Sequence, residues 1–227
     1  MALERKLKVL NKPYVKSFKD KHGIVFDCVD MYKQPAFDHP LLKNHKLQES
    51  TWTGPSTAGQ RIRVHPQESC PDGTVPIRRT LKQDLVMASL SSPRFRPANN
   101  KDHSEIPGQH FAQLLVDSVA GSKFQGASAL LEVDTVAVPV GQVSSAQILL
   151  VDDSFHSSVV NVVQAGWSDS QTRFTTYWTA DDYRSTGCLN MQCPGFVVVS
   201  QTSTPGMVLP GGIAAISISK VPAECNN

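Results

Sequence analysis

Tyr177-Trp-Thr-Ala-Asp-Asp-Tyr-Arg-Ser-Thr-Gly-Cys188-Leu-Asn-Met-Gln-Cys193-Pro-Gly-Phe196 is the stretch that decides the fold of this 227-residue chain. It gathers four aromatic residues and two closely spaced cysteines, whereas aromatic residues make up only 7% of the whole sequence. By composition, the stretch predicts a strand, then a loop that a short disulfide can close, then a second strand.

The same pattern extends over the second half of the chain. Beyond residue 105 the sequence is rich in Val, Ser, Thr and Gly, and apolar runs are separated by Gly, Ser, Asp or Pro. A spacing of about ten residues between such runs is typical of an antiparallel β-sandwich. We expect strands at 108–116, 124–133, 145–151, 159–167, 173–179, 195–201 and 213–219.

The first half has a different pattern. Leu3, Leu7 and Leu10 have helical spacing, residues 23–32 alternate as a strand does, and the prolines between 35 and 40 disfavour regular structure. A Pro-Asp-Gly turn after Cys70 leads into another short strand. We therefore predict a small α+β N-terminal segment (residues 1–95), a linker (96–104) and a β-domain (105–227).

Charge, hydropathy and cysteine content indicate which kinds of partner and which cellular compartment to expect. A net charge of +2 gives no reason to expect nucleic acid, and no run of eighteen apolar residues predicts a membrane span. The N-terminus lacks the apolar core of a signal peptide. Five cysteines fit either a cytosolic protein with inert thiols or a secreted protein whose signal peptide is missing here, and we favour the second.

Two motifs of the N-terminal segment are specific enough to compare with known families. The first is Asp27-Cys-Val-Asp-Met-Tyr-Lys-Gln-Pro-Ala-Phe-Asp-His-Pro-Leu-Leu-Lys-Asn-His45. The second is Cys70-Pro-Asp-Gly-Thr-Val-Pro-Ile-Arg-Arg79. Both resemble the activation peptide of the neprosin family, which are secreted plant glutamic prolyl endopeptidases made as zymogens.

The β-domain carries shorter matches in the family's order. They are Gln109-His-Phe-Ala, Phe124-Gln-Gly-Ala, Ser145-Ala-Gln147, Ala165-Gly-Trp167 and the block from Tyr177 to Phe196. The resemblance implies that residues 1–95 are an inhibitory activation peptide and that 105–227 are a neprosin catalytic-type β-sandwich. Secretion to the cell exterior is implied in the same way.

The resemblance also implies where the catalytic groups lie. A glutamic peptidase needs one carboxylate to activate water and a second group to donate a proton and hold the oxyanion. Gln147 matches the family's assisting glutamine, whereas Gln164 stands where the first catalytic glutamate is expected. An amide of similar size cannot take a proton from water. The second glutamate is expected beyond residue 227, so we expect a truncated domain, incomplete at its C-terminus, and an inactive chain.

Other residues were considered as catalysts and as parts of the cleft. The acidic residues of the β-domain lie mostly in predicted loops, where turn formation explains them, and no Gly-x-Ser-x-Gly elbow accompanies the scattered histidines. We assign Trp167 and Trp178 to the core and Tyr183 to the substrate cleft. The residues that we do not expect to be catalytic are Asp152, Asp153, Asp169, Asp181, Asp182, His39, His103, His110 and His156.

The cysteines allow three interpretations at the Cys188 and Cys193 pair: a disulfide, two free thiols or part of a metal site. A zinc site needs about four ligands and His156 is the one nearby histidine, so metal is the least favoured. We expect Cys28 to pair with Cys70 and Cys188 with Cys193, with Cys225 left over. No metal and no cofactor are predicted.

Two functions follow. The first is a neprosin-type glutamic prolyl endopeptidase zymogen that cleaves after proline at acid pH, inactive in this form. The alternative is a non-catalytic secreted β-sandwich that binds Pro-rich peptide or cell-wall material. Under either, the partner is a peptide or protein, and the N-terminal segment is expected to cover the cleft, with the linker as an exposed processing site.

Overall fold

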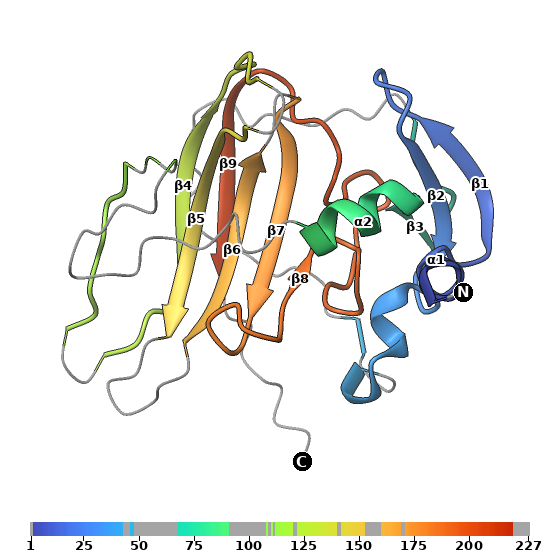
Figure 1. The fold of residues 1–227 in the computed structure, drawn as a ribbon, viewed down its shortest axis with the longest axis horizontal. Coiled ribbons are helices and arrows are strands. Elements are labelled where there is room, and N and C mark those ends of the chain that lie inside the picture. Colours follow the sequence, from blue (N-terminus) through green and yellow to red (C-terminus); the bar gives the residue numbers. More distant parts are fainter. Residues whose placement is uncertain are drawn as a thin grey trace.

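The computed structural model has two parts that lie side by side, a small N-terminal sheet and a larger β-domain (Figure 1). It describes residues 2–42, 46–47, 68–90, 108, 110, 112–119, 122–139, 142–152, 160–168 and 171–219. The predicted linker at 96–104 and Cys225 lie outside the described residues. No described helix is long and apolar enough to cross a membrane.

The N-terminal segment is built on a three-stranded antiparallel sheet in the order β1-β2-β3. The predicted helix at 2–10 and both predicted strands are present. Two short 3-10 helices occupy the Pro-containing stretch that we expected to be irregular, because proline is tolerated in the first turn of a helix. The elements are α1 (Ala2–Leu10), β1 (Tyr14–Lys19), β2 (Val25–Asp30), η1 (Pro35–Asp38), η2 (Pro40–Leu42), β3 (Thr74–Arg78) and α2 (Lys82–Leu90).

The β-domain contains a two-stranded and a four-stranded antiparallel sheet, so the chain is mainly antiparallel β, as predicted. Strand β4 pairs with β9, and the second sheet has the order β5-β6-β7-β8. Trp167, Val133 and Ala214 form a core between the two sheets, which gives a sandwich-like arrangement. The strands are β4 (Gly126–Val133), β5 (Ser145–Asp152), β6 (Asn161–Ser168), β7 (Arg173–Thr179), β8 (Cys188–Leu189) and β9 (Gly212–Ser219).

Two of the seven predicted strands are wrong. The described residues of 108–116 are not paired into a sheet, and Leu114 is 91% exposed. Residues 195–201 also form no strand, and groups of the N-terminal segment bond two of these residues in place of a neighbouring strand. The side chain of Gln34 holds Val198, and the amide of Cys70 donates to the carbonyl of Gln201.

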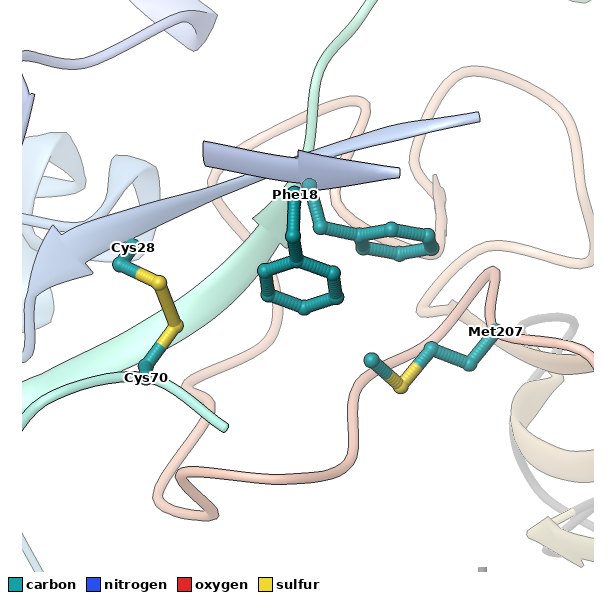
Figure 2. Close-up of a cluster of buried hydrophobic side chains, with 5 residues drawn as sticks. Phe18, Cys28, Cys70 and Met207 are labelled. Atoms are coloured by element: carbon teal, nitrogen blue, oxygen red, sulfur yellow. A yellow bond between two sulfur atoms is a disulfide. The ribbon is translucent and has the colours of Figure 1, made fainter. Parts of the chain in front are cut away.

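The two parts share a hydrophobic core. Met207, which precedes β9, packs against Phe18, Phe26 and the disulfide between Cys28 and Cys70 (Figure 2). In a second cluster, Met191 and Val198 of the β-domain pack against strands β2 and β3 through Val29, Val75 and Ile77. The N-terminal sheet therefore docks on the connection between β8 and β9.

Candidate functional site

Strands β5, β6 and β7 bring the polar side chains of the candidate site onto one face of their sheet. Gln164 on β6 lies directly opposite Leu149 on β5 and Tyr177 on β7. Gln147 lies opposite Gly166, two residues further along β6, so Gln147 and Gln164 are diagonal neighbours on the same face. The two candidate glutamines are thus brought together by strand register.

Gly166 is required at this point of the sheet. A Cβ atom added to it would lie 2.1 Å from the carbonyl oxygen of Ala146 and 2.6 Å from the Cα of Gln147. Only a residue without a side chain allows β5 to approach β6 this closely. The glycine of the Ala-Gly-Trp motif therefore sets the distance between the strands that carry the two glutamines.

Gln164 is buried, with 2% of its surface exposed. Its Nε2 donates a hydrogen bond of 3.1 Å to the hydroxyl of Tyr183, and the ring of Tyr183 stacks on Tyr177 with centroids 5.4 Å apart. Burial raises the pKa of Tyr177, and the negative charge of Asp181 adds to this shift. The site is therefore a buried carboxamide beside two stacked tyrosines.

The loop after β7 places Tyr183 over the sheet. Asp182 and Tyr183 adopt left-handed backbone conformations, with φ of 56° and 61°, which non-glycine residues seldom take. Thr179 stabilises this turn because its hydroxyl accepts a 3.0 Å hydrogen bond from the amide of Tyr183. Strained backbone held by specific hydrogen bonds is frequent at functional sites.

Asp181 anchors the same loop through its carboxylate. Its carboxylate accepts hydrogen bonds from the hydroxyls and amides of Ser185 and Thr186. The Ser185 hydroxyl is the largest contributor, and together these bonds hold the pKa of Asp181 far below the ordinary aspartate value. This lowered pKa disfavours the protonated form that an acid catalyst must hold.

Comparison with family models agrees with the geometry. Residues 17–115 match the neprosin activation peptide, and residues 140–218 match neprosin. The chain belongs to the neprosin family. The activation-peptide match includes strands β2 and β3 and the second half of β1, and the neprosin match includes Gln147, Gln164 and Tyr183, so both parts of the neprosin precursor are represented.

Each described disulfide lies within one part of this neprosin-family chain. Cys28 pairs with Cys70 across 42 residues, and Cys188 pairs with Cys193 across five. These are the two pairs that the sequence led us to expect, and they are consistent with an extracellular protein.

The shorter bridge lies next to Trp178, which faces Cys188 across β7 and β8. Trp167, by contrast, belongs to the core between the sheets, and its Nε1 donates to the carbonyl of Glu132 at 2.8 Å.

Several of the acidic residues and histidines that we rejected as catalysts from the sequence are exposed or lie outside the described residues. Asp152 is exposed at the end of β5, and His110 is exposed in an unpaired segment. Asp153, Asp169, His103 and His156 are not among the described residues. Within the described part of the chain, no cluster of three or more His, Cys, Asp or Glu side chains could hold a metal ion.

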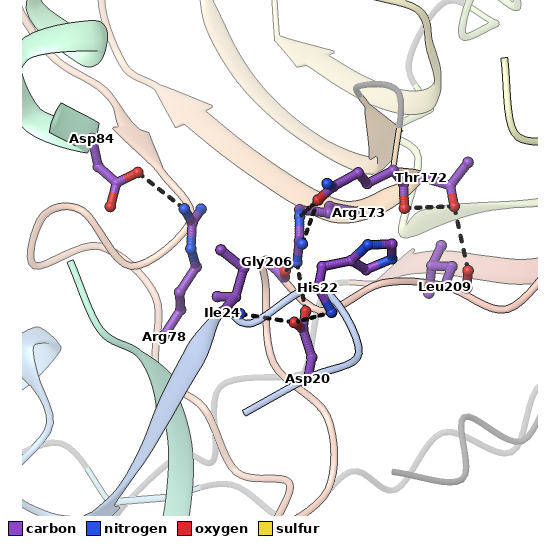
Figure 3. Close-up of polar contacts among 10 residues, drawn as sticks. Asp20, His22, Ile24, Arg78, Asp84, Thr172, Arg173, Gly206 and Leu209 are labelled. Atoms are coloured by element: carbon purple, nitrogen blue, oxygen red, sulfur yellow. Dashed lines mark hydrogen bonds and ion pairs between the residues drawn. The ribbon is translucent and has the colours of Figure 1, made fainter. Parts of the chain in front are cut away.

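One charged group was missed from the sequence. Arg173, at the start of β7, forms an ion pair of 3.0 Å with Asp20 of the N-terminal segment and donates to the carbonyl of Gly206 at 2.8 Å (Figure 3). The side chains of Arg173 and Asp20 are only 7% and 16% exposed. No signal in a single sequence indicates a pair of residues so far apart along the chain.

Proposed function

We propose that this neprosin-family chain is a secreted precursor whose site at Gln164 and Tyr183 binds an extended, Pro-containing peptide without hydrolysing it. The supporting observation is the buried Gln164 carboxamide, which is hydrogen-bonded to Tyr183 at the position where the family resemblance expects a carboxylate. The proposal combines the family's peptide-directed activity with the chemistry of this chain's own side chains.

The carboxamide lacks the basicity that peptide hydrolysis needs. Activation of water requires a group that accepts its proton, and an amide oxygen at ordinary pH does not. Gln147, the nearest glutamine on the same face, is also an amide. The site therefore offers neutral hydrogen-bonding groups where the hydrolytic reaction needs a base.

The same groups suit peptide binding. A carboxamide carries both a donor and an acceptor, which are the complements of a peptide carbonyl and a peptide amide. The stacked pair of Tyr177 and Tyr183 supplies an aromatic surface, and proline rings pack well on such surfaces. A Pro-containing peptide in extended conformation presents both backbone hydrogen-bonding groups and a proline ring.

A second candidate is an active prolyl endopeptidase that works at acid pH after removal of its activation peptide. Family membership favours it, because both the activation peptide and the neprosin part are matched. In that case the water-activating carboxylate is supplied by a residue other than Gln164. The two proposed functions can be told apart by one measurement, because only the active peptidase produces cleaved peptide.

The test is to incubate the full chain at acid and neutral pH with a fluorescent Pro-containing peptide, and to follow binding by anisotropy and cleavage by mass spectrometry. We expect saturable binding and no new fragments. Tyr183→Phe, which removes the hydroxyl that Gln164 contacts, should weaken binding, whereas Tyr32→Phe on the exposed surface of the N-terminal segment serves as the matched control. Steady cleavage after proline that Gln164→Ala abolishes would refute the non-catalytic proposal.

A further inference from the structure

Three apolar side chains of the connection between β8 and β9 pack on the N-terminal segment rather than in the core of their own domain. Leu209 belongs to the core between the two sheets of the β-domain. Met191, Val198 and Met207 instead belong to the two clusters built with Phe18, Phe26, Val29, Val75, Ile77, Cys28 and Cys70. These three side chains therefore depend on the N-terminal sheet for their burial.

Gln34 gives this contact its specificity. Its side chain is fully buried, and its Oε1 accepts a 2.7 Å hydrogen bond from the amide of Val198 while its Nε2 donates a 2.8 Å bond to the carbonyl of the same residue. These are the two bonds that a neighbouring β-strand would make with Val198. The Nε2 also donates to the carbonyl of Met31, which fixes the orientation of the carboxamide.

The ion pair between Asp20 and Arg173 adds a charged contact next to Met207 in the chain, at Gly206. Both side chains are largely buried, and the Arg173 guanidinium also donates to the carbonyl of Gly206 (Figure 3). Buried charge pairs across an interface penalise a wrong partner or register strongly, because an unmatched charge stays desolvated. The interface is therefore specific as well as apolar.

We propose that residues 190–209 together with Arg173 form a binding site for the N-terminal segment that keeps hold of it after the connecting chain has been cut. Each described disulfide closes within one part, so the described bridges leave the two parts without a covalent link once the connection is cleaved. The occupant is this chain's own N-terminal sheet, from the same molecule or from a second copy. Proteolytic cleavage and release of the segment are then separate events.

This inference does not depend on whether the β-domain cleaves peptides. To test it, the recognition sequence of a site-specific protease is inserted between residues 96 and 102 of the full chain, and the purified protein is cut without reduction. We expect the two fragments to co-elute on size-exclusion chromatography at micromolar concentration and to separate only in denaturant. Separate elution of two folded fragments would overturn the proposal.

A variant pair tests the assignment to this surface. Gln34→Ala removes a side chain that bonds both peptide groups of Val198, so in the cut protein the fragments should dissociate at least about tenfold faster. Lys33→Ala changes the preceding residue, whose exposed side chain pairs with Asp30 of the same segment, and should leave the rate unchanged. Equal rates for the two variants would place the binding energy elsewhere. If Gln34→Ala fails to fold, Asp20→Asn, which preserves side-chain size, takes its place in the same comparison.

Discussion

Replacing Asp20 with Asn removes one negative charge from the interface and leaves the shape of the side chain unchanged. The carboxylate of Asp20 accepts 2.9 Å hydrogen bonds from the amides of His22 and Ile24 and a 3.0 Å bond from Arg173. The Asn oxygen can still accept from the two amides, so the turn should persist. The change therefore isolates the charged contact with Arg173.

The size of the effect follows from the burial of Arg173. Removing one partner of a fully buried ion pair costs about 3–5 kcal/mol, because the other charge stays desolvated. Here Arg173 keeps the carbonyl of Gly206 as a neutral acceptor, and Asp20 is partly exposed. We expect Asp20→Asn to lower the free energy of unfolding by about 2–3 kcal/mol at neutral pH.

The effect should depend on pH in a defined direction. Burial alone would raise the pKa of Asp20, but the hydrogen bonds from Ile24, Arg173 and His22 outweigh it and lower that pKa below the ordinary value of 3.8. A carboxyl group with a lowered pKa in the folded state stabilises the protein fully above 3.8, and this contribution is lost as the pH falls through the folded value. The difference in unfolding free energy between wild type and Asp20→Asn should therefore be constant above pH 3.8 and shrink only below it.

Urea denaturation at several pH values measures both quantities. The matched control is Asp30→Asn, because Asp30 pairs with Lys33 on the open surface and exposed ion pairs contribute little to stability. We expect no measurable change for this control at neutral pH. An equal loss in both variants, or a loss in Asp20→Asn that persists undiminished under strongly acid conditions, would show that the buried pair does not act as described.

Two further predictions concern the framework around the site. Gly166→Ala places a methyl group 2.1 Å from the carbonyl oxygen of Ala146, so β5 must shift. Thermal unfolding should therefore show a loss of stability of about 1–3 kcal/mol. An unchanged melting temperature would contradict the strand register. Replacing both Cys28 and Cys70 with Ser opens a bridge across 42 residues and should cost about 4 kcal/mol in urea denaturation, against about 2 kcal/mol for the five-residue bridge of the β-domain. Equal losses for the two bridges would rule out loop closure as the source of their stabilisation.

The strands of the β-domain were predictable from sequence because their signal is local. Five of the seven expected strands are present, and apolar runs rich in Val and Thr, separated by Gly, Ser, Asp or Pro, are enough to predict them. The helix at Ala2–Leu10 carries an equally local signal in its leucine spacing. Local patterns of apolar residues and turn residues thus account for most of the secondary structure.

The segment 195–201 shows where local patterns fail. Its residues have the composition of a strand, but a strand also needs a neighbour that bonds its peptide groups. For Val198 that neighbour is the side chain of Gln34, 164 residues earlier in the chain. A single sequence contains no information on such a pairing, so the strand was predicted and a docked loop is present.

The residues of the candidate site could be predicted from the sequence, but the contacts between them could not. Gln147, Gln164 and Tyr183 were selected from the family resemblance and from aromatic content. The hydrogen bond between Gln164 and Tyr183 depends on the left-handed backbone at Asp182 and Tyr183, which these residue types do not signal. The anchoring of that turn by Asp181 likewise becomes visible only in three dimensions.

Gln34 and Gln164 are two buried carboxamides whose chemistry can be compared within one molecule. Gln34 uses its donor and its acceptor together to hold both peptide groups of Val198, which is recognition of an extended backbone by a single neutral side chain. Gln164 is equally desolvated and lies on a sheet face beside stacked tyrosines. A carboxylate at that position would repel a peptide carbonyl, whereas a carboxamide donates to it. Because the N-terminal interface demonstrates how a glutamine in this fold binds backbone, the amide at Gln164 is better suited to holding a peptide than to cutting one.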